Sequence, residues 1–162
     1  MTQYEMVVNK LKELNIGFQQ VNHPPALTTE EADKYIEGME GVRTKTMFLT
    51  NKKKTDWFLV VMDDLKRLDM ERFEEIAQTK RVKMASPESL MEKMGLTPGS
   101  VSVFGLLNNA DHDIKVYVEK AIIDEARMSF HPNDNTKTIF ISTPDMFRFI
   151  ESEGYEVNIA EL

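Results

Sequence analysis

The sequence contains no cysteine. This absence excludes disulfide bridges, thiolate metal ligands and a cysteine nucleophile, and it suits a reducing compartment. No apolar run approaches the roughly 18 residues that a membrane-spanning helix needs. The first residues, 1–5, lack the basic and apolar regions of a signal peptide. We therefore expect a cytoplasmic protein with no membrane partner.

The sequence also lacks the usual motifs of nucleotide and metal sites. Neither Gly-x-Gly-x-x-Gly nor a Walker-type loop is present. The three histidines, His23, His112 and His131, do not pair at helical spacing, so we expect no zinc site. No serine lies in a nucleophile elbow, which argues against a serine hydrolase triad. We expect no metal and no cofactor.

The net charge of −7 argues against tight, general binding of nucleic acid, DNA included, because phosphate contacts need lysine and arginine. A locally basic face on an acidic body is nevertheless compatible with brief contact with one end of an RNA. The alternative is that residues 52–54 are only a solvated hairpin tip. The basic residues gather at Arg43, Lys45, Lys52, Lys53, Lys54, Lys80, Arg81 and Lys83.

The length of 162 residues fits one domain with its own core, so we expect residues 1–162 to form a single domain. Amphipathic spacing and capping signals predict helices at 2–14, 69–77 and 87–94, with shorter ones beginning near 28 and 143. Residues rich in β-formers predict strands. The predicted strands are 18–21, 44–49, 57–62, 82–84, 114–118 and 138–142, with a further extended stretch at 101–104.

The order of these elements favours an α/β (α+β) fold. A polar stretch at 51–56 predicts a hairpin between two strands, and helices are interspersed among the strands. We expect a mixed, largely antiparallel sheet packed by helices, and not a regular doubly wound fold.

Three local features are candidates for chemistry, and each has a plain structural alternative. Lys45 lies inside a strand pattern, where a lysine usually points to solvent. Residues 99–105 place two glycines around small polar residues, so the backbone can approach a ligand closely; the same pattern fits a simple turn. His131 precedes a Pro-Asn-Asp-Asn turn and can instead bond to nearby backbone.

Taken in order, the segments resemble the YbaK/ProX editing domains, also called prolyl-tRNA-synthetase-associated domains. Residues 23–32 resemble the family's His-Pro-x-x-hydrophobic-Thr-x-Glu-Glu-Ala segment, and 45–49 resemble its Lys-Asn-Leu-Phe-Leu strand. Residues 99–106 resemble its glycine loop, and 131–136 its His-Pro-x-x-Asn-Thr block. The match runs along nearly the whole chain. Within the family, the length of the chain and its Asn-Asn pair at 108–109 most resemble the freestanding alanine-editing branch.

The resemblance implies a trans-acting aminoacyl-tRNA deacylase for translational proofreading, with alanine on proline tRNA, Ala-tRNA(Pro), as the first substrate. One missing methylene discriminates by only about 1–3 kcal/mol, so a synthetase for proline needs a second, smaller sieve. The implied partner is the aminoacylated 3′ end of tRNA. Prolyl-tRNA synthetase and an elongation factor are further candidate partners.

The resemblance also implies site residues. Lys45, His131 and Gly99 are the catalytic candidates: the lysine anchors a phosphate or the ester oxygens, the histidine binds the aminoacyl end or places water, and the loop backbone supplies oxyanion donors. Leu27 and Phe104 are candidates for the wall that sets substrate size. The other expected substrate-binding residues are His23, Thr28, Thr46, Ser100, Val101, Ser102, Gly105, Asn133 and Asn135.

Two positions depart from the family pattern. Thr46 stands where asparagine is usual, and Val103 stands where proline is usual. The first departure keeps open a deacylase for serine, threonine or cysteine on tRNA. A binding module that holds tRNA or a synthetase without hydrolysis is the second alternative.

Overall fold

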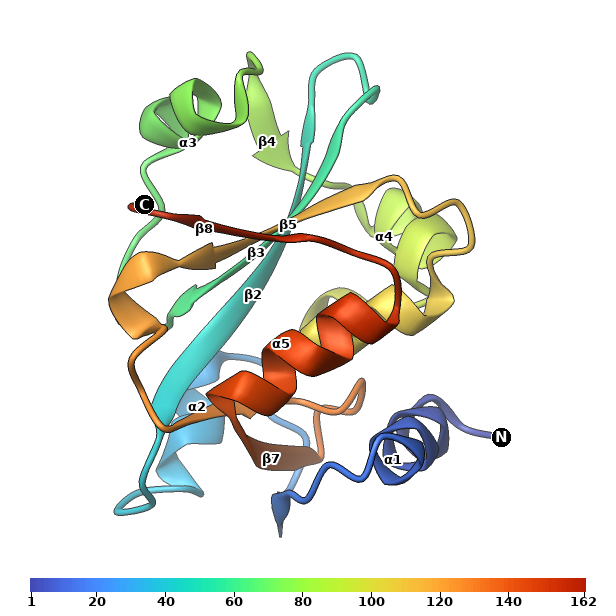
Figure 1. Cartoon of the computed structure of the whole chain (residues 1–162), viewed down its shortest axis with the longest axis vertical. Helices are drawn as coiled ribbons and strands as arrows, with labels where there is room; N and C mark the ends of the chain where they lie inside the picture. Colours follow the sequence, from blue (N-terminus) through green and yellow to red (C-terminus); the bar gives the residue numbers. More distant parts are fainter.

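In the computed structural model, which describes residues 1–162, the strands form one eight-stranded sheet (Figure 1). The order is β1-β7-β6-β2-β3-β5-β8, and β4 pairs with β2. Four pairings are antiparallel and three, β2–β6, β3–β5 and β5–β8, are parallel, which confirms the mixed sheet. The strands are β1 (Gln19–Asn22), β2 (Val42–Asn51), β3 (Trp57–Asp63), β4 (Val82–Met84), β5 (Ile114–Glu119), β6 (Arg127–Phe130), β7 (Lys137–Ser142) and β8 (Val157–Ala160).

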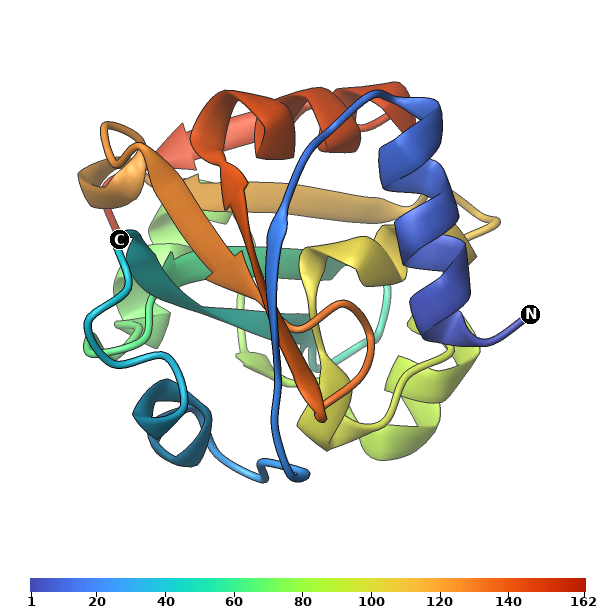
Figure 2. The same cartoon turned by 90° about the horizontal axis from the view of Figure 1, so that it is seen from below.

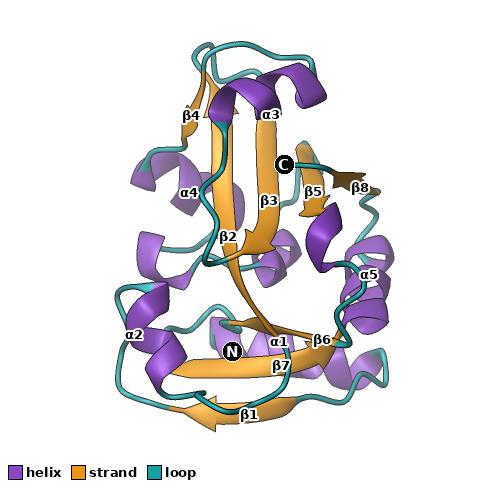
Figure 3. Cartoon of the chain, turned by 90° about the vertical axis from the view of Figure 1, so that its left-hand side faces the viewer, coloured by secondary structure: helices purple, strands orange, loops and turns teal.

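Strand β2 joins the two halves of the sheet. Its first residues pair with β6, and its remaining length pairs with β3. Figure 3 shows it running from the β6–β7 end of the molecule to the hairpin at the opposite end. A residue near the start of β2 therefore lies where the two halves meet.

The helix starts match the capping signals to within a residue, although Ser142 and not Thr143 caps the last helix. Thr28 Oγ1 accepts from the Glu31 N–H at 3.1 Å, and Gly95 ends its helix at φ 65°, as a C-terminal glycine does. The α-helices are α1 (Gln3–Glu13), α2 (Thr29–Lys34), α3 (Met70–Ala77), α4 (Pro87–Met94) and α5 (Thr143–Ser152). The 3-10 helices are η1 (Pro98–Ser100), η2 (Val103–Asn108) and η3 (Lys120–Ile122).

The expected extended stretch at 101–104 is wrong in its second half. Val103 and Phe104 begin the 3-10 helix η2, because the Ser102 side chain caps that helix and accepts from the Phe104 N–H at 3.1 Å. An apolar run of this length does not distinguish a strand from a short buried helix.

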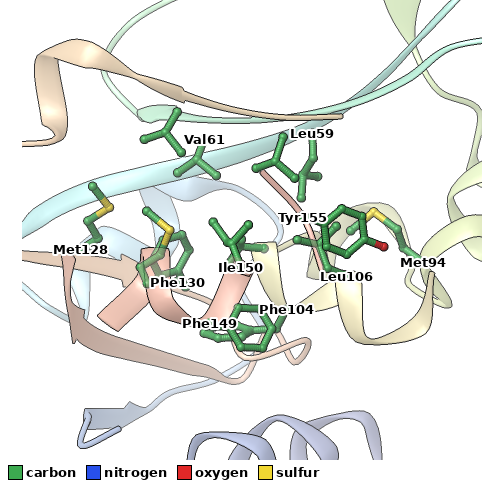
Figure 4. Packing of buried hydrophobic residues seen from close by; sticks show 14 of the residues in the cluster. Leu59, Val61, Met94, Phe104, Leu106, Met128, Phe130, Phe149, Ile150 and Tyr155 are labelled. Atoms are coloured by element: carbon green, nitrogen blue, oxygen red, sulfur yellow. The ribbon is translucent and has the colours of Figure 1, made fainter. Parts of the chain in front are cut away.

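Two hydrophobic clusters lie on the two faces of the sheet. The larger one is enclosed by α1, α4, α5 and η2 (Figure 4), and the smaller one lies under α3. Strand β3 serves both, since Leu59 and Val61 face the larger cluster while Phe58 and Val60 face the smaller one. Burial on both faces explains its unbroken apolar sequence.

The N-terminal helix packs against the C-terminal one. Lys10 of α1 forms an ion pair with Glu153, just after α5, at 3.2 Å, and Figure 2 shows the end of α1 close to the end of α5, with the two helices roughly at right angles. None of the helices has the length and apolar character that crossing a membrane requires.

Candidate active site

A cavity of about 110 Å³ lies where α2, β2, η1 and the end of β6 meet. It gathers residues from segments that are far apart in the sequence, and each segment belongs to one of the motifs singled out above. We call this space the cavity. Its lining residues are Ala26, Leu27, Thr28, Thr29, Thr44, Lys45, Thr46, Pro98, Gly99, Val101, Phe130 and His131.

Lys45 and Thr46 reach the cavity from β2. Thr44 fixes this part of the strand against β6, since its hydroxyl donates to the Ser129 carbonyl at 2.5 Å and its N–H donates to Ser129 Oγ at 3.3 Å. The Lys45 ammonium donates to the main-chain carbonyl of Lys66. The sheet therefore sets Lys45 at a defined place beside His131, which follows β6.

His131 presents one ring nitrogen as an acceptor. Its Nδ1 lies 3.0 Å from the Lys137 carbonyl, and because a carbonyl only accepts, we assign the proton to Nδ1 and leave Nε2 free. Burial, with a smaller effect from nearby His23, lowers the pKa of His131. The neutral ring is therefore the form at neutral pH, and it can accept a hydrogen bond from water or from an amino group.

His23 lies behind His131 and does not line the cavity. It is buried, its Nδ1 donates to the Pro24 carbonyl at 2.9 Å, and its Nε2 lies 2.9 Å from Thr138 Oγ1. Its ring stacks on Tyr35 and meets His131 edge-on at 6.3 Å between centroids. With both nitrogens engaged inside the chain, His23 supports the site and is not positioned to bind substrate directly.

The beginning of the glycine loop offers free donors to the cavity. The N–H groups of Gly99 and Val101 donate to no acceptor of the chain, whereas the Ser100 N–H between them donates to the Thr97 carbonyl at 2.9 Å. Gly99 and Val101 both line the cavity. Main-chain N–H groups that lack an acceptor and lie beside such a space can bind a developing oxyanion.

The end of the same loop has a packing role. The Gly105 N–H donates to the Ser102 carbonyl at 3.0 Å, and a Cβ on Gly105 would lie 2.2 Å from Met94 Cε. Phe104 is fully buried against Phe130 and Phe149. The expectation that Phe104 and Gly105 contact substrate therefore fails on geometry, because both lie in the core outside the cavity.

Three of the remaining expected residues, Ser102, Asn133 and Asn135, lie outside the cavity and form hydrogen bonds that fix the segments around it. Ser102 Oγ donates to Asn133 Oδ1 at 2.8 Å, and Asn133 adopts φ 58°. The Asn135 carbonyl accepts from the Ala26 N–H at 3.1 Å. Through these bonds the 131–136 turn ties the glycine loop to the segment before α2. Leu27 does line the cavity and is 76% exposed, so it lies at the rim.

Sequence patterns gave no sign of a carboxyl pair beside the site. Asp33 of α2 lines a smaller space of about 20 Å³ next to His131. Burial and the neighbouring carboxyl of Asp64 raise the pKa of Asp33 to about 8, against the opposing effect of Arg43. Both side-chain oxygens of Asp64 are buried and accept no hydrogen bond from the chain. No three histidine or carboxylate side chains gather in a way that could hold a metal ion.

Comparison with known proteins identifies the family. The model of the aminoacyl-tRNA editing domain matches residues 23–149. The chain is 30% identical over 159 residues to the prolyl-tRNA editing protein ProX of Acetoanaerobium sticklandii, covering 98% of this chain and 96% of that protein. It is 25% identical to the bovine prolyl-tRNA synthetase associated domain-containing protein 1, with 91% of this chain and 88% of that one covered.

Solved structures share the fold. A crystal structure of a candidate trans-editing enzyme for prolyl tRNA synthetase superposes with a TM-score of 0.77 at 16% identity, over all of this chain and 97% of the other. The family match extends across all four segments that build the cavity. The chain belongs to the aminoacyl-tRNA editing domain family, whose members are hydrolases of mischarged aminoacyl-tRNA.

Proposed function

We propose that the protein hydrolyses Ala-tRNA(Pro) in trans, in the cytoplasm, after prolyl-tRNA synthetase has attached the wrong amino acid. The observation that carries this proposal is the cavity itself. It is small, at about 110 Å³, and it brings together a lysine ammonium, a neutral histidine and two free N–H groups. For the cavity to act as a second sieve, its walls must admit a methyl side chain and exclude the larger ring of proline.

The reaction needs no covalent nucleophile, because the ester is already activated. Water attacks the ester carbonyl carbon, and the bond to the ribose oxygen then breaks, with the ribose hydroxyl and the free amino acid as products. The N–H groups of Gly99 and Val101 stabilise the negative charge on the carbonyl oxygen. The Lys45 ammonium anchors the ester or the terminal phosphate. Nε2 of His131 accepts from the water or from the substrate amino group and so orients it.

A basic groove supports an RNA partner. It has a volume of about 800 Å³ and is lined by Asn51, Lys52, Lys53, Thr55, Lys80 and Arg81, with no acidic residue. None of its four cations forms an ion pair within the chain. The groove forms because β4 pairs with the end of β2, which brings the loop after α3 beside the β2–β3 hairpin (Figure 1). We infer that phosphates of the acceptor arm lie here.

The distance between the basic groove and the cavity allows one RNA to contact both. Asn51 lies six residues farther along β2 than Lys45, which corresponds to roughly 20 Å along an extended strand. An RNA whose 3′ end enters the cavity can therefore reach the groove with nucleotides farther from that end.

The second candidate function is removal of serine, threonine or cysteine from tRNA. Four threonines, Thr28, Thr29, Thr44 and Thr46, line the cavity. Their hydroxyls could bond to a polar substrate side chain, and a site built to do so discriminates strongly against a substrate that lacks the group.

A substrate panel separates the candidates. Alanyl-, prolyl-, seryl-, threonyl- and cysteinyl-tRNA are incubated with the protein, and loss of each ester is followed. We expect alanine to be released fastest and proline to be retained. Release of serine, threonine or cysteine instead would support the deacylation reaction and identify the alternative substrate. Retention of every ester, together with measurable tRNA binding, would show a binding module and would contradict the proposal.

A further inference from the structure

A neighbouring turn, and no acidic side chain, holds Lys45 in place. The Lys45 ammonium donates to the main-chain carbonyl of Lys66, and it forms no ion pair. The carbonyl belongs to the turn at residues 63–66 after β3, which closes with the Lys66 N–H donating to the Asp63 carbonyl at 3.2 Å. The placement of this turn therefore sets where the Lys45 ammonium rests.

Glu119, at the end of β5, ties this turn to the sheet. The residue is 1% exposed. Its Oε2 accepts from the Asp63 N–H at 3.0 Å, and its Oε1 accepts from the Lys66 ammonium at 2.9 Å. Charge-assisted bonds to both oxygens give the carboxylate a fixed orientation, and a buried carboxylate is costly unless such partners are present. The hydrogen bond and the charge of Glu119 raise the pKa of Lys66.

We propose that Glu119 and Lys66 are positioning residues for Lys45: the buried carboxylate fixes the turn, and the turn's carbonyl holds the Lys45 ammonium beside the cavity. The inference rests on the proposed function, in which Lys45 binds the aminoacylated end of tRNA. Without the Lys66 ammonium, the turn retains the bond from the Asp64 N–H to the Arg43 carbonyl at 2.9 Å. The turn is then less firmly held but keeps its place, and the Lys45 ammonium becomes less well positioned beside the cavity.

Lys66→Met tests this directly, since the substitution removes the ammonium and leaves the main-chain carbonyl. We expect kcat/KM for alanyl-tRNA to fall about tenfold, because small displacements of a catalytic group are costly. Glu119→Gln, which keeps an acceptor for the Asp63 N–H and cannot contact RNA from its buried position, should also lower kcat/KM. The matched control is Lys120→Met, which breaks an exposed ion pair with Glu161 and should have no effect.

The Lys45→Ala background distinguishes positioning from a general structural effect. If Lys66 acts through Lys45, Lys66→Met lowers the residual rate no further in that background. An equal loss in both backgrounds would overturn the proposal. If Lys45→Ala itself keeps full activity, the proposed function fails. If Lys45→Ala is inactive while Lys66→Met and Glu119→Gln are fully active, only the positioning role fails.

A spectroscopic measurement gives an answer that does not depend on activity. With ¹⁵N-labelled lysine, the NH₃⁺ signal of Lys45 should be visible in the wild-type protein, because the carbonyl slows its exchange with water. We expect the signal to disappear in Lys66→Met and to persist in Lys120→Met. A Lys45 signal that is unchanged in Lys66→Met would contradict the proposal.

Discussion

At the scale of single residues, the protonation state of His131 links burial to chemistry. The ring is half-buried beside the cavity, and its Nδ1 proton is committed to the Lys137 carbonyl. Nε2 is then the only nitrogen that can accept from water or substrate, and only while the ring is neutral. The burial that lowers the pKa of His131 therefore keeps the ring in its useful form.

The first prediction concerns the pH dependence of deacylation. Because the folded-state pKa of His131 lies below the usual value of about 6.5, kcat/KM should stay level as the pH falls from 8 to 6.5 and drop only at lower pH. The contribution of His131 to the free energy of unfolding changes with pH in the same direction. It is present above the unfolded-state pKa and is lost as the pH falls through the folded-state pKa. A rate that already declines between pH 7.5 and 6.5, and does so in a His131-dependent way, would contradict this.

The second prediction concerns the Asp33 carboxyl. Its folded-state pKa of about 8 lies above that of an unfolded aspartate, so its stability contribution is complete below about pH 4 and is lost as the pH rises through 8. Asp33→Asn removes this loss, since the amide cannot ionise next to Asp64. We expect Tm at pH 8 to be higher in Asp33→Asn than in wild type, with a smaller difference at pH 5. Glu37→Gln, an exposed change in the same segment, is the control.

At the scale of elements, the two glycines of one motif differ in role. Gly105 lies against Met94 and Leu96, with no room for a Cβ, whereas a Cβ on Gly99 would meet Asn135 Nδ2 at an ordinary 3.5 Å. The motif therefore combines a residue that faces the cavity with one that closes the core between α4 and η2.

The third prediction follows from this difference. Gly105→Ala forces Met94 and Leu96 to move and should lower the free energy of unfolding by about 1–3 kcal/mol. Gly99→Ala, the matched control for stability, should unfold within about 0.5 kcal/mol of wild type. Urea unfolding of both variants measures this, and equal stabilities would show that Gly105 is not required by packing.

The sequence predicted elements better than it predicted contacts. Caps at Thr28 and Gly95 were readable because they depend on neighbours a few residues away. Strand β8 is only four residues long, Val157–Ala160, and the sequence analysis does not predict it. Phe104 was assigned to the cavity wall because its motif is compact along the chain, although the 3-10 helix turns it into the core. The turn that holds Lys45 depends on Glu119, more than fifty residues beyond Lys66, and no local pattern reports such a contact.

At the scale of the whole molecule, charge is distributed unevenly. The net charge is −7, yet the basic groove has no acidic lining residue. An acidic body limits nonspecific binding, while the groove gives phosphates a single favoured place.

The fourth prediction concerns salt. If the four groove cations each contact a phosphate, the logarithm of the tRNA association constant should fall with the logarithm of salt concentration with a slope of about −3. Lys80→Ala combined with Arg81→Ala should reduce that slope by about 2, whereas Lys12→Ala, at an exposed site on α1, should leave it unchanged. Fluorescence anisotropy at several salt concentrations measures the slopes. Binding that does not depend on salt would place the RNA elsewhere.

The central claim is that the cavity hydrolyses the ester of Ala-tRNA(Pro) with Lys45 as its anchoring cation. The most direct test is the rate of alanine release from this tRNA by wild type, Lys45→Ala and the control Lys12→Ala. We expect rapid release by wild type and Lys12→Ala, and a loss of about a hundredfold in Lys45→Ala, comparable to removal of one electrostatic contact to a transition state. Equal rates for all three proteins would contradict the account.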